Sequence, residues 1–260
     1  MAGTLLYLAS LIRLNVKSGM RPVSAALFAG LLMLANNLVF FVIWLIFFRR
    51  FSNLKGWTLE DVALLYGVAA WSIGLSVVIA AGARDIGQAI VDGRLDVHLG
   101  RPRHPLASLI FSRSIPAGLG DMASGVVLWL AFAGRGPLDL PFIILIATAG
   151  AAIVIATIAI TNAVVFWIPE AVHLTEDMFF MLVMASVYPQ HVFGPFLRLI
   201  LFTLIPAAFI GLVPVEAIRE ASIEKACWIL GAALVYSAIA WLVFERGLKR
   251  YASGSGGVAP

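Results

Sequence analysis

Stretches of about twenty residues with almost no charge fill most of this 260-residue chain. Residues 22–48, 62–83, 140–169 and 226–244 contain no Asp, Glu, Lys or Arg. Residues 114–134 hold only Asp121, and Arg198 divides a further apolar run that begins at Met178. A helix needs about 20 apolar residues to cross a hydrocarbon core of roughly 30 Å. Because no water there can satisfy exposed backbone groups, the crossing segments must be helices. The sequence therefore predicts an all-α, polytopic membrane protein.

The composition leaves room for one transmembrane domain and no separate soluble domain. Hydrophobic residues make up 62% of the chain and charged residues 12%, against about 25% charged in soluble domains. We predict a single domain over residues 1–250, followed by a flexible Gly/Ser-rich tail at 251–260. The net charge of +4 is small, and most cations flank the apolar stretches, so we predict no nucleic-acid partner. The single Cys227 excludes an internal disulfide framework, and the histidines lack metal-binding spacing, so we predict no metal site.

Charge and proline placement predict six crossings rather than seven. With the N-terminus inside, six crossings put eleven Lys and Arg residues on the inner side and seven outside. One charge-poor run must then fail to cross, and the proline-rich region after Met178 is the weakest candidate. We predict a helix capped by Thr175 that ends near Tyr188-Pro189, followed by a re-entrant hairpin at 194–213 before the last span.

The first 21 residues have the pattern of an amphipathic helix. Apolar side chains share one face, whereas Arg13, Lys17 and Arg21 form a stripe at helical spacing on another. Such a helix can lie in the membrane interface with its cations toward the headgroups. A helical extension of the first span into water would show the same pattern. We predict an interfacial helix at 1–21 and keep the extension as the alternative.

The longest polar connection is the loop at 84–105, between the second and third apolar stretches. Val91, Leu95 and Leu99 are spaced four apart and would form one apolar face of a short helix. The polar pairs at the same spacing are Asp92 with Asp96 and Arg94 with His98. Gly100 and Pro102 would end the helix. An amphipathic helix here can rest on the membrane or dock in a groove of a partner protein.

This loop resembles one in a known family of permeases. The residues that match are Ile90, Gly93, Leu95-Asp96, Leu99 and Arg101-Pro102. They resemble the I-x-x-G-x-L-D-x-x-L-x-R-P loop after the second span of ABC-2-type exporter permeases, in the branch of short six-span permeases without a fused ATPase. Gly56-Trp57 and Tyr66 fit the same branch, as do Tyr188-Pro189, Arg198, Pro206 and Pro214. The resemblance covers nearly the whole chain in order.

The resemblance implies a transmembrane permease subunit of an exporter, in a bacterial-type cytoplasmic (inner) membrane with both termini cytoplasmic. It implies three partners: the lipid bilayer, an ABC ATP-binding subunit, which holds ATP and Mg, and a second permease subunit, identical or homologous. The loop would be the coupling helix that docks on the ATPase. The docking candidates are Asp92, Gly93, Arg94, Leu95, Asp96, His98, Leu99 and Arg101. This chain has no G-x-x-x-x-G-K-[ST] motif, so we expect it to bind no cofactor and to be no enzyme itself.

Polar and adaptable side chains within the predicted spans are candidates for the transport pathway. They are Asn36, Asn37, Ser72, Ser76, Asp121, Phe180, Met181 and Met184. Polar groups in spans commonly bond between helices, at about 0.6 kcal/mol each, and apolar ones pack against lipid or other helices. Those simpler roles apply to each of these residues.

Two other functions fit part of the sequence. An intramembrane carboxylate such as Asp121 could carry protons, which would make the chain a proton-coupled secondary transporter. Asp92-Gly93 resembles part of the D-x-x-D-G-x-x-A-R motif of membrane phosphatidyltransferases. The preceding Asp85 is seven residues back rather than three, and Asp96 stands at the Ala position, so the carboxylate arrangement is broken.

Overall fold

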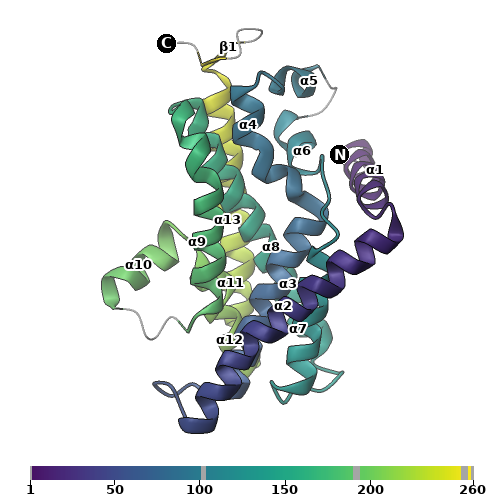
Figure 1. Cartoon of the computed structure of the whole chain (residues 1–260). Helices are drawn as coiled ribbons and strands as arrows, with labels where there is room; N and C mark the ends of the chain where they lie inside the picture. Colours follow the sequence, from purple (N-terminus) through teal and green to yellow (C-terminus); the bar gives the residue numbers. More distant parts are fainter. Residues whose placement is uncertain (1, 101–103, 190–193, 253–256, 259–260) are drawn as a thin grey trace.

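The computed structural model describes residues 2–100, 104–189, 194–252 and 257–258. Helices make up almost all of it, which confirms the predicted all-α membrane fold. The longest are α2 (Val23–Arg50), α3 (Leu59–Ala80), α8 (Leu140–Ala163) and α13 (Ile223–Leu248). Figure 1 shows α1 (Ala2–Gly19), α4 (Ile86–Val91), α5 (Leu95–Leu99), α6 (Pro105–Ile110) and β1 (Tyr251–Ala252) gathered at one end of these helices. α1 and β1 therefore lie near the predicted coupling loop.

Helix length and composition identify fewer spans than the six that charge placement predicts. Among the described residues, four helical segments are long and apolar enough to cross a membrane: 23–50, 59–91, 140–166 and 223–248. A fifth forms only if 195–203 and 207–219, which are bent by 73°, count as one broken span. The helices α7 (Gly118–Ala131) and α9 (Thr175–Val187) are shorter, at 14 and 13 residues. The structure therefore supports a polytopic protein with four or five spans by this criterion.

Helix α3 lies at the centre of the molecule. It is apolar on all sides, as expected of a helix buried in a larger bundle, and α2, α7, α8 and α9 pack around it. Its start is fixed by a capping box, in which Thr58 Oγ1 accepts from Asp61 N (3.4 Å) and Asp61 Oδ2 accepts from Thr58 N (2.9 Å). By contrast, α2 and α13 expose large apolar side chains along their outer faces, which suits contact with hydrocarbon.

Glycines let α7 approach α2 and α3 at backbone distance. A Cβ on Gly120 would clash with the backbone oxygen of Gly30 in α2, and a Cβ on Gly118 would clash with that of Gly74 in α3. Further along α7, a Cβ on Gly125 would lie 2.7 Å from the backbone oxygen of Gly67 in α3. Small residues at helix contacts permit such close packing in membranes, where the hydrophobic effect does not drive helices together. These glycines therefore fix α7 between α2 and α3.

The N-terminal helix is separate from the first long span. Helix α1 (Ala2–Gly19) ends before Pro22, whose extended backbone precedes α2, so a continuous helical extension is excluded. Asn15 Nδ2 donates to Phe111 O (2.7 Å), and a Cβ on Gly19 would lie 2.9 Å from Ser114 O. α1 therefore docks against the segment that follows α6 (Pro105–Ile110).

The loop at 84–105 differs from the single amphipathic helix predicted. A 3₁₀ turn, η1 (Ala81–Asp85), leads into α4 (Ile86–Val91), and α5 (Leu95–Leu99) follows after a break. The break occurs because Gly93 adopts a φ of +72°, a left-handed conformation that glycine takes without steric cost. The predicted pairing of Asp92 with Asp96 on one helix face is therefore wrong, since the two residues lie on either side of this break.

Helix α9 has the predicted bounds but not the predicted cap. It begins at Thr175 and ends at Val187, where Tyr188 is extended. The 3₁₀ helix η3 (Pro169–Leu174) runs directly into α9, so Thr175 is already helical and its Oγ1 donates to Val172 O (2.9 Å). A second 3₁₀ turn, η2 (Val164–Phe166), joins α8 to this region.

The region of the predicted re-entrant hairpin contains three short helices. They are α10 (Pro195–Thr203), α11 (Ala207–Ile210) and α12 (Leu212–Arg219). Figure 1 shows α10 projecting from the bundle beside α9, while α12 leads to the start of α13. Their 73° bend fits either a broken span or a re-entrant loop. In the tail, β1 (Tyr251–Ala252) pairs antiparallel with β2 (Gly257–Val258), and β2 contacts α4.

We expect Gly120→Ala to lower the free energy of unfolding by about 1–3 kcal/mol, because the new methyl group must displace the α2 backbone. The matched control is Gly231→Ala in α13, where a Cβ meets no atom within 4 Å. That variant should be as stable as the wild type or slightly more stable. Thermal unfolding in detergent, followed by tryptophan fluorescence, compares the two; equal effects of both variants would contradict the close contact.

Candidate functional site

A cavity of about 840 Å³ lies between α2, α3, α7 and α9. Its lining on α2 runs from Met33 to Phe47, which corresponds to roughly 21 Å of helix. Tyr66, Ile73 and Val77 of α3 form another wall. Figure 1 shows α2 crossing obliquely over α3, and the lining from α9 completes the wall of the cavity. The cavity is therefore elongated and mostly apolar.

Contacts between different helices bound the two ends of this cavity. At the end toward the α4–α5 loop, the Arg84 guanidinium lies 4.4 Å from the centre of the Phe179 ring and forms an ion pair with Glu176. At the other end, the rings of Trp44 and Tyr188 meet edge to face at 6.1 Å. Of these side chains, Arg84, Phe179, Trp44 and Tyr188 line the cavity, whereas Glu176 lies outside the lining. A relative movement of α9 would therefore change both ends at once.

One side of the cavity is polar. Asn37 Nδ2 donates to Asp121 Oδ1 (2.7 Å) and to Ser124 Oγ (3.0 Å), and Ser124 Oγ donates to Asp121 O (2.7 Å). Asp121 lies in the first turn of α7 and is only 6% exposed. Among the described residues, the hydrogen-bond partner of the Asp121 carboxylate is the neutral amide of Asn37. The carboxylate is thus oriented by a hydrogen bond from another helix.

The cavity brings together five of the eight pathway candidates. Asn36, Asn37, Asp121, Phe180 and Met184 line it. Ser72 instead joins α3 to α8, since its Oγ donates to Ala147 O (2.8 Å), and Ser76 Oγ donates to Ile73 O within α3 (2.7 Å). Met181 lies outside the lining and is 45% exposed. These last three positions fit interhelical bonding or packing.

Sequence reasoning missed several lining residues. Arg84 enters the charge pattern only as a cation at the end of a span. The aromatic lining residues that were missed are Phe40, Trp44, Phe47, Tyr66, Phe179 and Tyr188. No periodicity could identify them, because the spans are apolar on every face. The crowding of aromatic residues in α2 was the one available signal.

The proposed docking residues divide into supporting and exposed groups. Leu95 is fully buried, and His98 Nδ1 lies 2.8 Å from Ser108 Oγ of α6, so both residues hold the loop in place. Asp92 and Arg94 are exposed and paired with each other, with Nε and Oδ2 3.2 Å apart.

The exposed surface of the loop also has an apolar part. Leu99 is half-exposed at 38%, and Val97, which the sequence motif did not single out, is 64% exposed. Gly93 forms the turn between α4 and α5, and Arg101 lies outside the described residues. Among the described residues of the loop, the exposed side chains that are charged or apolar are Asp92, Arg94, Val97 and Leu99, which we call the loop surface.

The loop is tied to the C-terminal end of α13. The His104 ring stacks on Trp241 with centroids 3.5 Å apart, and its Nε2 donates a hydrogen bond to the Glu245 carboxylate. His104 Nδ1 also accepts from Leu106 N (3.3 Å), which caps α6. Beyond α13, burial raises the pKa of Tyr251 to about 12, and the nearby Asp96 carboxylate of α5 acts in the same direction. Movement of the loop would therefore be transmitted to α13.

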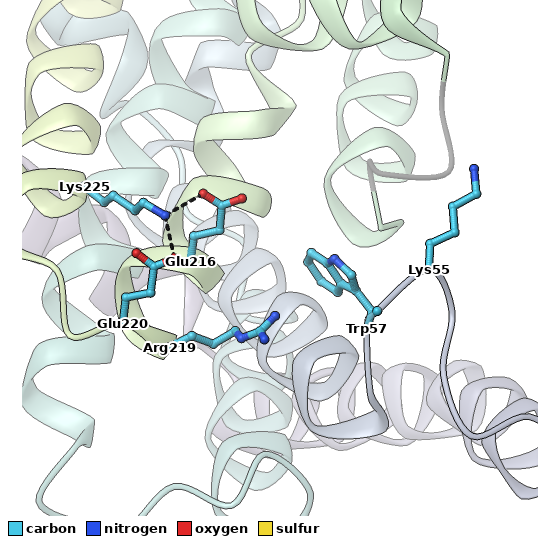
Figure 2. A pocket seen from close by; sticks show the side chains of 7 residues that line it. Lys55, Trp57, Glu216, Arg219, Glu220 and Lys225 are labelled. Atoms are coloured by element: carbon cyan, nitrogen blue, oxygen red, sulfur yellow. Dashed lines mark hydrogen bonds and ion pairs between the residues drawn. The ribbon is translucent and has the colours of Figure 1, made fainter.

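A polar cluster lies at the opposite end of the molecule from the loop. A second cavity of about 420 Å³ is lined by Lys55, Trp57, Glu216, Arg219, Glu220 and Lys225. In Figure 2 the Trp57 ring is directed toward the group formed by the last four residues. Lys225 Nζ lies 2.9 Å from Glu216 Oε2 and 2.8 Å from Glu220 Oε1.

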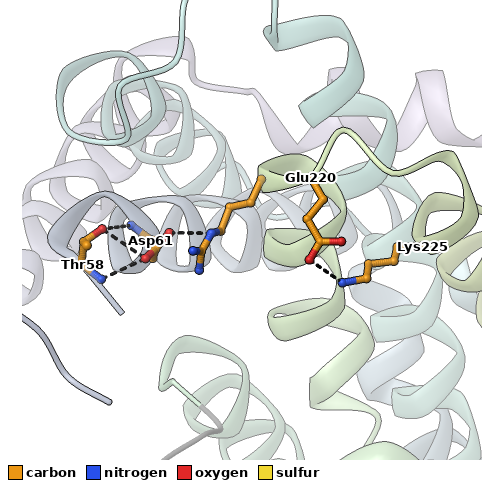
Figure 3. A network of polar contacts seen from close by, with 5 residues as sticks. Thr58, Asp61, Glu220 and Lys225 are labelled. Atoms are coloured by element: carbon orange, nitrogen blue, oxygen red, sulfur yellow. Dashed lines mark hydrogen bonds and ion pairs between the residues drawn. The ribbon is translucent and has the colours of Figure 1, made fainter. Parts of the chain in front are cut away.

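An ion pair extends this cluster to the start of α3. Arg219 Nε lies 3.2 Å from Asp61 Oδ1, beside the Thr58–Asp61 cap shown in Figure 3. The cluster thus holds the start of α3 to α12, and α12 to α13. Because breaking a buried ion pair leaves an uncompensated charge, Asp61, which is only 7% exposed, gives this end of the bundle a fixed geometry.

The carboxylates near the loop are paired with arginines instead of gathered together. Arg113 Nε lies 2.8 Å from Asp85 Oδ2, and Asp92 pairs with Arg94. Among the described residues, no group of three or more His, Cys, Asp or Glu side chains could hold a metal ion. This arrangement does not favour metal-dependent transferase chemistry, which needs converging carboxylates.

A bundle of membrane helices around an elongated apolar cavity is the arrangement of a membrane transport protein. Comparison with protein families agrees with this class. A family described as ABC-2 family transporter protein matches residues 32–255. The chain therefore belongs to the ABC-2 transporter family and is an ABC-2-type permease, as its loop motif predicted. Neither the curated proteins nor the solved structures give a significant match.

We expect His104→Ala to speed amide hydrogen exchange in the α5–α6 segment by about tenfold, because it removes a charge-assisted hydrogen bond and a ring stack that fix the loop. His173→Ala is the matched control, since His173 lies exposed in η3. Hydrogen exchange with mass spectrometry on the protein in detergent measures both. Unchanged exchange at α5–α6 in the His104 variant would show that the loop is held by other contacts.

Proposed function

We propose that this chain is the transmembrane permease subunit of an exporter whose ATP is hydrolysed by a separate ATP-binding subunit. The family match carries the proposal, because ABC transporters are powered by ATP and this chain contains no phosphate-binding G-x-x-x-x-G-K-[ST] sequence. The ATP and Mg would therefore be held by the partner, and the contribution of this chain is the pathway through the membrane. This is the role of a transport subunit and not that of an enzyme.

The loop surface is the proposed docking site for the ATPase. Two charged residues of opposite sign, Asp92 and Arg94, lie beside the apolar Val97 and Leu99. A small helical surface of this kind suits insertion into a groove, where apolar anchors give affinity and the charges fix orientation. Leu95 underneath is fully buried, so the loop presents a supported surface.

The contacts of the loop suggest how docking is coupled to the cavity. Arg84 stands at the root of the loop, lines the cavity and pairs with Glu176 at the start of α9. His104 connects the other side of the loop to Trp241 and Glu245 of α13. When the ATPases close, displacement of the loop would pull on α9 and α13 through these two sets of contacts. The Trp44–Tyr188 contact would then separate and open the far end of the cavity.

The proposed topology has six crossings, formed by α2, α3, α7, α8, α9 and α13, with α10–α12 as a re-entrant segment. α7 and α9 are short for a roughly 30 Å core, but each continues into an adjoining turn or 3₁₀ helix. In this arrangement α1, the loop and β1 face the cytoplasm in a bacterial-type inner membrane (Figure 1). The exposed apolar faces of α2 and α13 would contact lipid and a second permease, identical or homologous.

A proton-coupled secondary transporter is the second candidate, and the position of Asp121 in the cavity favours it. Intramembrane carboxylates are by default functional. In that case transport would stop when the proton gradient is dissipated at constant ATP, and Asp121→Asn would abolish it. An exporter driven by a partner ATPase would continue to transport under dissipation.

We expect Val97→Glu to abolish co-purification of an ATP-binding subunit, because a charge would occupy an apolar contact of the loop surface. Leu138→Glu is the matched control: Leu138 is 94% exposed in the turn before α8, at the other end of the molecule. The measurement is a mild-detergent pull-down from native membranes with mass spectrometry.

A second variant tests coupling at the same surface. Reversing the charges of Arg94 and Asp96 should leave ATP hydrolysis intact while transport is lost. Because Asp96 is partly buried, its reversal can also disturb the loop, so Arg94→Glu alone is the more specific variant. In the pull-down, two results would refute the docking assignment: recovery of the wild-type chain without any P-loop ATPase, or co-purification of as much ATPase with Val97→Glu as with the wild type.

A further inference from the structure

Among the described residues that line the cavity, one charged side chain has no balancing ion pair. Its charged lining residues are Arg84 and Asp121. Arg84 is paired with Glu176 and lies over the Phe179 ring, so its charge is compensated. The ion pairs between described residues do not include Asp121, whose carboxylate accepts a hydrogen bond from Asn37. The electrostatic character of the cavity is therefore set by one carboxylate.

The hydrogen bond from Asn37 orients the Asp121 carboxylate without neutralising its charge. Asn37 donates from α2, and the glycine contact between Gly30 and Gly120 fixes α2 and α7 at this point. An amide donor aims a carboxylate but leaves its formal charge in place. Because the surroundings are apolar, a charge there interacts with a ligand more strongly than it would in water. The Asp121 carboxylate is therefore positioned to bind a positively charged group.

Aromatic side chains surround the rest of the space. Phe40 and Trp44 come from α2, Tyr66 from α3, and Phe179 and Phe180 from α9. The faces of such rings attract organic cations as well as apolar groups. By contrast, an anionic ligand would meet the carboxylate of Asp121 and find the guanidinium of Arg84 already paired. The lining therefore favours cations over anions of the same size.

The dimensions fit a small molecule with a substantial apolar body. The volume of about 840 Å³ lies within the range of about 300–1,000 Å³ of drug-sized binding sites. The lining is predominantly apolar, and its polar groups are gathered around Asn37 and Asp121. Such a distribution suits a ligand with one charged centre and a hydrophobic remainder.

We propose that this cavity binds lipophilic organic cations, with Asp121 as the charge partner and the aromatic side chains of α2, α3 and α9 around the apolar body. That such a cation is transported rests on the proposed function, whereas its binding to the cavity does not. In this proposal Asp121 binds the ligand in addition to joining α7 to α2. An asparagine at this position could also accept the hydrogen bond from Asn37, so joining the helices alone does not require a carboxylate.

The test compares two ions of the same shape and opposite charge, tetraphenylphosphonium and tetraphenylborate. Each radiolabelled ion is titrated onto the full chain, with any subunit that accompanies it, in nanodiscs of zwitterionic lipid, and binding to empty nanodiscs is subtracted. The wild type should bind the phosphonium, and Asp121→Asn should weaken this binding by at least about tenfold. Binding of the borate should not weaken in that variant.

Asp177→Asn is the matched control, because Asp177 is an exposed acid at the start of α9 outside the cavity lining. It should bind both ions as the wild type does. Phe180→Ala provides a second test, which should weaken the phosphonium several-fold while leaving Asp121 in place. It keeps the proposal falsifiable if the Asp121 variant does not fold.

The outcomes separate this inference from the proposed function. Equal phosphonium binding by the wild type and Asp121→Asn, or no preference of the wild type for the cation, overturns the inference even when an ATPase co-purifies. Loss of phosphonium binding in Asp121→Asn and Phe180→Ala supports it even when no ATPase is found, and in that case only the proposed docking function fails.

Discussion

The structure depends on the close approach of α7 to two other helices. Glycines at the contacts with α2 and α3 allow backbones to touch where any side chain would separate them. This approach places Asp121 within hydrogen-bonding distance of Asn37 and leaves the remaining space between α2 and α9 as a cavity. Both the polar side and the shape of the cavity follow from one packing constraint, because a wider spacing would separate the amide from the carboxylate.

The two ends of the bundle are held in different ways. At the loop end, single side chains join separate helices: Arg84 reaches α9 and His104 reaches α13. At the far end, the buried Asp61 and its partner Arg219 fix the start of α3 to α12. Of the titratable side chains in these three contacts, only Asp61 is buried, so we infer that the loop end moves more readily than the far end. This asymmetry suits a permease that receives force on one side of the membrane.

Much of the fold was predictable because bilayer physics leaves few options. The charge-free runs predicted the long helices, and Thr175 and Tyr188 were the correct limits of α9. The loop was predicted as one helix because spacing of four residues dominates the pattern. A single glycine overrides that pattern at Gly93, where a positive φ breaks the helix. The supporting role of Leu95 was not predictable either, because a sequence motif does not distinguish buried from exposed residues.

By itself the sequence determined the class of protein, its family and the absence of an ATP-binding motif, because these depend on composition and local motifs. Only the tertiary structure decided which polar residues meet. Asn37 and Asp121 are 84 residues apart, and Ser72, equally polar and within a span, bonds α8 instead. In a membrane helix every face is apolar, so periodicity does not show which face turns inward. Backbone contacts between distant helices make that choice, and with it they form the cavity.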